Sequence, residues 1–365
     1  MISYRRPDSI FLAIIITLCV IGVIIFSSAS TAESFRTLGD PNSMLIKQIL
    51  PLIIGFAILY FAQMIDYRHW IKWSNILLIL SILILFLPFV PGIGKELLGA
   101  KRWISIGGFF FQPSEVLKIG MIIYLAAWLP KIQNNWRDYK KTLVPFSILI
   151  AGCALMLMLQ RDLGTTLIIF IIATAMYFIA GAPVKHLLWI LVGIILVILL
   201  LIKFEPYRAE RLTTFLNPQQ DSQDSSYHIN RSLLAIGSGG WFGRGLGKSI
   251  QKFNYLPEAA GDSIFAVAAE ELGFIVVLGI VFLYTAIYIR GRKLAKKISD
   301  PGGRLIIMGV VIWITAQAFV NIGALTGILP LTGIPLPFIS NGGSALIVSL
   351  GSIGVLLNVT KQIRS

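Results

Sequence analysis

Four carboxylates lie in the segment YLPEAAGDSIFAVAAEELG (255–273), which begins like a loop and ends like an apolar helix. Asp262 directly precedes the apolar run and has two interpretations. It could cap the helix by accepting hydrogen bonds from the first N–H groups, and the local sequence favours this. An ionised carboxylate facing a water-filled cavity would also be a competent general base. Glu270 and Glu271 follow about 12–13 Å along the helix, where at least one must face the protein interior or water.

A second pair of charges stands in GGFFFQPSEVLKIG (107–120). Pro113 suits the first turn of a helix, and Glu115 and Lys118, three residues apart, then share one helical face. The pair could simply hold helices together, or it could organise a site, since ionisable groups within a membrane are costly and usually functional. In QRDLGTTLI, Asp162 could cap the next helix or point its carboxylate into a cavity, and this stretch alone favours the cap.

Two further segments break the helical pattern. GSGGWFGRGLGKS (237–249) is rich in glycine but is not a Walker A motif, because Phe242 stands where that motif needs glycine. Its N–H groups could still bind a phosphate, although a flexible turn is the simpler interpretation. GILPLTGIPLPFISNGGSA (327–345) has three prolines among apolar residues and cannot form a continuous helix. Irregular backbone at membrane depth must be buried in protein or face water, so this segment predicts a cavity that opens to the outside.

The elements that position these residues are membrane helices. Of 365 residues, 56% are hydrophobic and 13% are charged, whereas soluble domains have about 25% charged residues. Apolar runs long enough to cross a bilayer recur along the chain. The pattern predicts an all-α polytopic membrane protein with about ten transmembrane helices, at 10–30, 44–64, 73–91, 112–130, 143–160, 163–181, 186–204, 263–289, 305–326 and 340–360. Cys19 and Cys153 lie in apolar runs and are expected to be buried thiols.

The distribution of basic residues predicts the orientation. With the N-terminus inside, the densest basic patch, RGRKLAKKISDPGGR (290–304), is also inside, so both termini should be cytoplasmic. This explains the net charge of +14 without nucleic acid. Most other basic residues fall in two outward segments, 94–108 and 205–262, where they suit either an anionic ligand or lipid head groups. The second segment is long and has apolar periodicity, so we expect an ordered, partly helical cap.

Together these segments resemble the SEDS family of membrane proteins, the FtsW/RodA type, along nearly the whole chain. The similarity is carried by KRWISIGGFFFQPSEVLK, QRDLGTT, AIGSGGWFGRGLGKSIQKFNYLPEAAGDSIFAVAAEELG and NIGALTGILPLTGIPLPFISNGGSALI, in that order. The YLPEA and AEELG contexts look closer to the FtsW branch. The resemblance implies a single membrane domain over 1–365, with 205–262 as an extracytoplasmic loop between spans seven and eight.

The resemblance also implies an activity. Family members are peptidoglycan glycosyltransferases that polymerise lipid II at the outer face of the bacterial cytoplasmic membrane. Their partners are class B penicillin-binding proteins and other division or elongation proteins, and their ligands are lipid II and the nascent lipid-linked glycan. Asp262 matches the family's essential aspartate, and Glu115 and Lys118 match its membrane pair, which would organise the site. A lipid-linked sugar flippase and an inactive scaffold that recruits a transpeptidase are the alternatives.

This activity assigns roles to the candidate residues. Asp262 would take the proton of the acceptor hydroxyl as general base. Asp162, Glu258 and Ser340 are expected to bind substrate or organise the site. The departing diphosphate needs cations or N–H donors, and the candidates are Lys101, Arg102, Arg211, Arg244, Lys248 and Lys252. The sequence requires no cofactor, although a divalent cation, Mg2+ or Mn2+, could assist.

Several positions depart from the family pattern. The family commonly reads PEAHTDFIF where this chain reads PEAAGDSIF, so the neighbours of the aspartate differ. The replaced positions are Ala260, Gly261 and Ser263 around the aspartate, His228 and Arg231 in place of glutamines, Asn341 in place of tyrosine and Arg161 in place of proline. The aspartate is retained while its neighbours are not, so the reaction stays plausible and the substrate contacts are expected to differ.

Overall fold

The computed structural model describes residues 7–97, 99–106, 109–193, 225–253 and 255–363. Helices dominate it. They are α1 (Ser9–Ala29), α2 (Thr31–Leu38), α3 (Ser43–Ala62), α4 (Tyr67–Lys72), α5 (Ser74–Ile84), α6 (Pro113–Ile132), α7 (Leu143–Leu159), α8 (Leu163–Ile179), α11 (Ser225–Ser238), α12 (Ile264–Lys296), α13 (Pro301–Leu325) and α14 (Gly343–Thr360). Short 3-10 turns, η1 (Leu87–Phe89) and η2 (Gln133–Asn135), follow α5 and α6.

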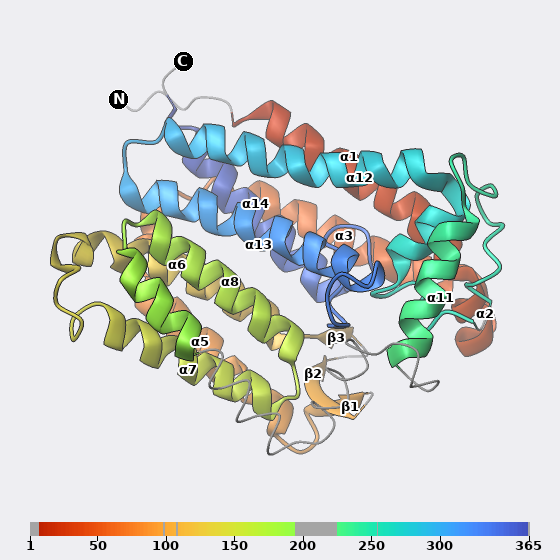
Figure 1. Cartoon of the computed structure of the whole chain (residues 1–365), viewed down its shortest axis with the longest axis horizontal. Coiled ribbons are helices and arrows are strands. Elements are labelled where there is room, and N and C mark those ends of the chain that lie inside the picture. The colour runs from red at the N-terminus through yellow and green to blue at the C-terminus, as the bar shows by residue number, and fades with distance from the viewer. Residues whose placement is uncertain (1–6, 98, 107–108, 194–224, 254, 364–365) are drawn as a thin grey trace.

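The long helices lie side by side as a bundle (Figure 1). The start of α1 and the end of α14 lie at one end of it, while α2, α11 and a small sheet lie toward the other, which we call the sheet end (Figure 1). Five helices, α1, α3, α12, α13 and α14, are long and apolar enough to cross a membrane. Shorter apolar helices cover Ser74–Phe89, Leu143–Leu159, Leu163–Ile179 and Val184–Gly193. The chain is therefore a mostly helical, multi-pass membrane protein, as predicted, although the predicted span at 186–204 extends beyond the described residues.

Burial separates the centre of the bundle from its outer surface. Helix α13 contacts α6, α8, α12 and α14, and most of its side chains are buried. Helices α3 and α12 instead expose large apolar side chains, among them Ile53, Phe61 and Phe282. A wide exposed apolar surface of this kind is what a membrane protein presents to lipid.

A three-stranded antiparallel sheet, which the all-α expectation did not include, occupies part of the predicted outward segment. Its strands are β1 (Gly94–Leu97), β2 (Ala100–Ile106) and β3 (Phe109–Phe111), in that spatial order. Ile104 of β2 pairs with Phe111 of β3. The segment KRWISI contains tryptophan and two β-branched isoleucines, residue types that strands favour. The sheet leads directly into α6 and therefore fixes where that helix begins.

Helix α12 is interrupted at Gly273, whose φ of 79° lies in the left-handed region that favours glycine. Such a break deprives backbone groups of their helical partners, and the glycine-rich segment 239–245 supplies new ones. The N–H group of Arg244 donates to the carbonyl of Glu270 (2.9 Å), and beyond the break the N–H of Phe274 donates into the same segment (2.9 Å). The glycines thus allow close backbone packing against a membrane helix, in place of the flexible turn considered from the sequence.

Candidate active site

Asp262 lies in the turn that leads into α12 at the sheet end. Ser263 occupies the N-cap position of that helix, so the expectation that Asp262 caps it is wrong by one residue. The backbone of Asp262 is fixed from α13, because Asn321 donates through Nδ2 to the Asp262 carbonyl (2.7 Å) and to the Ile334 carbonyl (2.8 Å). Asp262 is half-buried, and its Oδ2 would lie 3.8 Å from a β-carbon added at Gly333. The carboxylate therefore faces the irregular, proline-rich segment.

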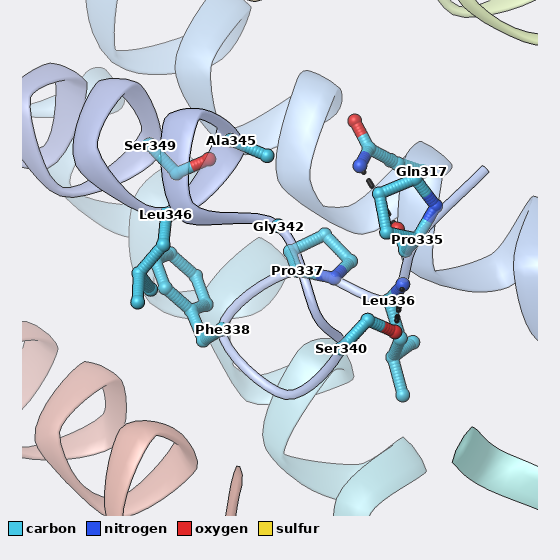
Figure 2. Close-up of a pocket in the computed structure, with 10 residues that line it drawn as sticks. All are labelled: Gln317, Pro335, Leu336, Pro337, Phe338, Ser340, Gly342, Ala345, Leu346 and Ser349. Carbon is cyan, nitrogen blue, oxygen red and sulfur yellow. Dashed lines mark hydrogen bonds between the residues drawn. The ribbon is translucent and has the colours of Figure 1, made fainter. Parts of the chain in front are cut away.

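That segment, between α13 and α14, is non-helical as predicted and is held by specific hydrogen bonds. Gln317 donates to the Pro335 carbonyl (2.9 Å), and the Leu336 N–H donates to Ser340 Oγ (2.8 Å) (Figure 2). Phe338 takes a left-handed φ of 67°. The pocket drawn in Figure 2 has only about 10 Å³ open to the centre of a water molecule, enough for about one water. Ser340 thus organises the backbone, and this pocket is far smaller than a sugar.

Asp162 serves as a helix cap and as the centre of a polar cluster. Its Oδ1 accepts a hydrogen bond from the Thr165 N–H (3.1 Å), which confirms the predicted cap of α8. Its Oδ2 accepts from Gln112 Nε2 (3.1 Å) and Ser114 Oγ (3.4 Å). Arg102, from β2, places its Nη1 3.8 Å from the Oδ1 of Asp162. The cap and the sheet therefore place a guanidinium over a nearly fully buried carboxylate.

The proline-rich segment connects the Asp162 cluster with Asp262. A β-carbon at Gly164 would lie 2.7 Å from the Thr332 carbonyl and 2.6 Å from Ile334, so the start of α8 abuts this segment directly. Gly333, between those two residues, faces Asp262. The turns that carry the two acids therefore both approach the same short stretch of backbone.

Glu115 and Lys118 form the predicted ion pair, with Lys118 Nζ 2.8 Å from Glu115 Oε1. Lys118 also donates to Gln317 Oε1 (2.9 Å) and lies 4.7 Å from the ring centroid of Trp313. Gln317 in turn holds the Pro335 carbonyl. The pair is buried and is linked through Gln317 to the backbone of the proline-rich segment, and its role in organising a site stays a prediction.

Glu270 and Glu271 both face the protein interior. Glu270 accepts hydrogen bonds from Ser249 Oγ (2.6 Å) and the Ile250 N–H (3.0 Å). Glu271 accepts from Ser28 Oγ (2.8 Å), from the Ser249 N–H (3.2 Å) and from Lys252 Nζ (2.8 Å). We call these contacts the carboxylate anchor. It ties the loop that precedes Asp262 onto α12 and α1.

The predicted cations separate into different environments. Arg102 is in the Asp162 cluster, and Lys101 is exposed beside Glu96, 3.9 Å away. Arg244 is partly exposed at 3.8 Å from Glu270, and Lys248 is exposed. Lys252 is buried and donates to Ser28, Gly247 and Glu271, so we assign it to the carboxylate anchor and not to the diphosphate. Arg211 lies outside the described residues.

Glu258 lies close to Asp262, and Glu33 lies close to Glu258. Partial burial, followed by the negative charge of Asp262, raises the pKa of Glu258, whose side chain keeps an exposed surface. Burial and the charge of Glu258 likewise raise the pKa of Glu33 in α2. Glu258 has a left-handed φ of 46°, and its carbonyl accepts from the N–H groups of Gly261 (2.9 Å) and Ser263 (3.2 Å). The turn therefore concentrates negative charge where a cationic group or metal ion would be favourable.

Some residues of the site were not anticipated. Asn321 and Gln317, one helical turn apart on α13, each hold a carbonyl of the proline-rich segment, and Gln112 holds Asp162. Polar side chains within or beside apolar helices were the available signal. The replaced positions also come together: His228 contacts Ser263, and the Asn341 N–H donates to the Ala260 carbonyl (2.8 Å).

Known proteins resemble this chain along its whole length. The model of the FtsW/RodA/SpoVE family, described as cell cycle protein, matches residues 8–365. A probable peptidoglycan glycosyltransferase FtsW from Geobacter sp. (strain M18) is 39% identical, covering 98% of this chain and 97% of that protein. Stage V sporulation protein E from Bacillus subtilis (strain 168) is 38% identical, covering 98% of each.

Solved structures agree in fold. A chain from a structure that describes the coordination of polymerization and crosslinking by a peptidoglycan synthase complex has a TM-score of 0.82 and 28% identity, with 98% of each chain covered. The Thermus thermophilus rod shape determining protein RodA has a TM-score of 0.71 and 27% identity, again with 98% of each chain covered.

Proposed function

This chain belongs to the FtsW/RodA/SpoVE family of cell cycle proteins, and from that premise we propose that it is a peptidoglycan glycosyltransferase that polymerises lipid II. The observation that carries the proposal is the placement of Asp262. A half-buried carboxylate stands at the sheet end of a membrane bundle and faces backbone that departs from helix between two membrane spans. A lipid-linked sugar would meet water at such a boundary.

The reaction needs a base, because the acceptor is a sugar hydroxyl with a high pKa. Its oxygen attacks the anomeric carbon of the donor, the bond from that carbon to the diphosphate oxygen breaks, and Asp262 takes the hydroxyl proton. Inversion at that carbon converts an α-linked donor into a β-linked product. A positioned base of this kind typically contributes about 10² to 10⁴-fold to the rate.

The leaving diphosphate needs positive charge, and Arg102 is the best-placed candidate. Its guanidinium lies beside Asp162, and its buried Nε–H has no acceptor among the residues that the structure describes. Charge-assisted hydrogen bonds from a guanidinium to phosphate oxygens are strong and directional. Arg244 and Lys248, more exposed on the loop before Asp262, would attract the lipid-linked anion.

A divalent cation also fits the acids of the turn. Within the described ranges, no three His, Cys, Asp or Glu side chains gather to hold a metal ion. Mg2+ is, however, often held by one or two carboxylates together with substrate phosphates. Glu258, whose pKa is raised partly by Asp262, would hold the ion with the substrate diphosphate, and the ion would supply charge neutralisation there.

The proposed location is the bacterial cytoplasmic membrane, with both termini inside and the sheet end outside. The proposed partner is a class B penicillin-binding protein that cross-links the new strands, together with other division or elongation proteins. Support for the partner comes from the similarity to a chain of a peptidoglycan synthase complex.

Assays of glycan synthesis and of lipid transport distinguish a glycosyltransferase from a flippase. The purified protein with its transpeptidase partner should convert lipid II into glycan polymer, and Asp262→Ala should abolish the product. Asp40→Ala, which changes an exposed acid between α2 and α3, is the matched control and should retain activity. Lipid movement across vesicles without polymer would favour the flippase and refute the proposal.

A further inference from the structure

The hydroxyl of Ser263 does not cap α12, although Ser263 occupies the N-cap position of that helix. Serine at an N-cap usually accepts a hydrogen bond from its own helix, but Ser263 makes no such side-chain bond. Its Oγ donates instead to the Pro257 carbonyl (2.7 Å) and lies 2.6 Å from His228 Nε2. A hydroxyl has one proton to donate, so the nitrogen must supply the proton of the second bond. The geometry thus makes His228 an Nε2–H donor to Ser263.

This bond joins the helix of the loop to the turn that carries Asp262. His228 belongs to α11, which contacts both α12 and α13. Ser263 is fully buried, which strengthens a hydrogen bond by lowering the local dielectric constant. The other restraints on the turn come from elsewhere: Asn321 binds the Asp262 carbonyl from α13, and Asn341 binds the Ala260 carbonyl from the proline-rich segment.

We infer that His228 is a positioning residue for Asp262, acting through Ser263. The inference rests on the proposed function, in which Asp262 is the base. His228 pulls Ser263 toward α11 and away from its helix, Ser263 holds the Pro257 carbonyl, and these two bonds fix the ends of the turn on either side of Asp262. Without the imidazole donor the turn keeps its fold but loses the restraint that α11 supplies through Ser263.

The requirement for a donor at one defined nitrogen gives a specific test. Glutamine can place an amide N–H near the position of Nε2, whereas leucine cannot donate. With purified full-length protein and lipid II, His228→Leu should lower kcat about tenfold and leave KM nearly unchanged, since misplacement of a catalytic group affects the chemical step. His228→Gln should retain at least half of the wild-type kcat.

Ser263→Ala removes the acceptor and also the donor to the Pro257 carbonyl, so it should lower kcat at least as much as His228→Leu. Because the bond between His228 and Ser263 is broken in both single variants, the double variant should be no slower than Ser263→Ala alone. If His228→Leu folds poorly, Ser263→Ala, the smaller change, carries the test alone.

A wild-type kcat in His228→Leu or Ser263→Ala would overturn the inference. So would a double variant whose fold-reduction in kcat equals the product of the two single reductions. Equal loss in the Gln and Leu variants would also overturn it, because the donor would then not matter. Full polymer formation by Asp262→Asn would instead refute Asp262 as the base, and the inference with it, whereas no polymer from the wild-type protein with its partner would overturn the proposed function itself.

Discussion

Breaking the carboxylate anchor should destabilise the protein strongly even when the change keeps the size of the side chain. Glu271→Gln keeps the size of the side chain but removes its charge. The structure places three donors on that carboxylate, and one of them is the ammonium of Lys252, whose side chain is 1% exposed, as is that of Glu271. Removing one partner of a buried ion pair costs about 3–5 kcal/mol, because the other charge stays buried.

That cost should be visible as a shift in the unfolding temperature. At roughly 2 °C per kcal/mol, the value for larger domains, the variant should unfold about 6–10 °C below wild type. A thiol-reactive fluorophore can report it, because Cys19 and Cys153 are buried and react only on unfolding. Glu96→Gln is the matched control: it breaks an exposed pair with Lys101, which should cost less than about 1 kcal/mol.

A second substitution tests the cause of the loss. Lys252→Met combined with Glu271→Gln removes the stranded cation, so the double variant should regain a large part of the lost stability. If Glu271→Gln unfolds within about 2 °C of wild type, as the Glu96→Gln control should, the anchor does not hold the loop and the reasoning fails.

Two other predictions concern the glycine-rich segment and the acidic turn. Gly243→Ala should prevent stable folding, because the φ of Gly243 is 78° and the new β-carbon would collide with the Glu271 carbonyl. Gly237→Ala is the control and should be tolerated, because open space surrounds Gly237. Equal yields of the two folded variants in detergent would contradict this prediction. Glu258→Gln should raise the unfolding temperature only slightly near neutral pH, because Glu258 is exposed and solvent screens its charge. Burial and Asp262 raise the pKa of Glu258, so the stability it contributes is present below pH 4.5 and lost as the pH rises through the raised value. If the rise in unfolding temperature caused by Glu258→Gln instead grew larger below pH 4.5, the predicted sign would be wrong.

Features that depend on neighbours in the chain were predictable from the sequence. Membrane helices followed from apolar length, because the bilayer fixes how long such a run must be. The Glu115–Lys118 pair followed from three-residue spacing, and the Asp162 cap from its place before an apolar run. In each case the partner lies within one helical turn, so spacing alone determines contact.

Features that depend on distant segments were not predictable in this way. Glu271 finds Lys252 and, more than two hundred residues earlier, Ser28. Nothing in the loop sequence shows that Lys252 is used there and not at the diphosphate. The prediction that Asp262 caps α12 failed for a related reason. Hydrogen bonds from α11, α13 and the proline-rich segment shape the turn before Ser263, and they override the local preference for Asp262 as the cap.

The polymerisation rate of Asp262→Asn tests the central claim most directly. Asparagine has nearly the same shape as aspartate but cannot take a proton from a sugar hydroxyl. At saturating lipid II, with unfolding temperature equal to wild type, the variant should form glycan polymer at least about 100-fold more slowly. A rate within twofold of wild type would show that the carboxylate is not the base.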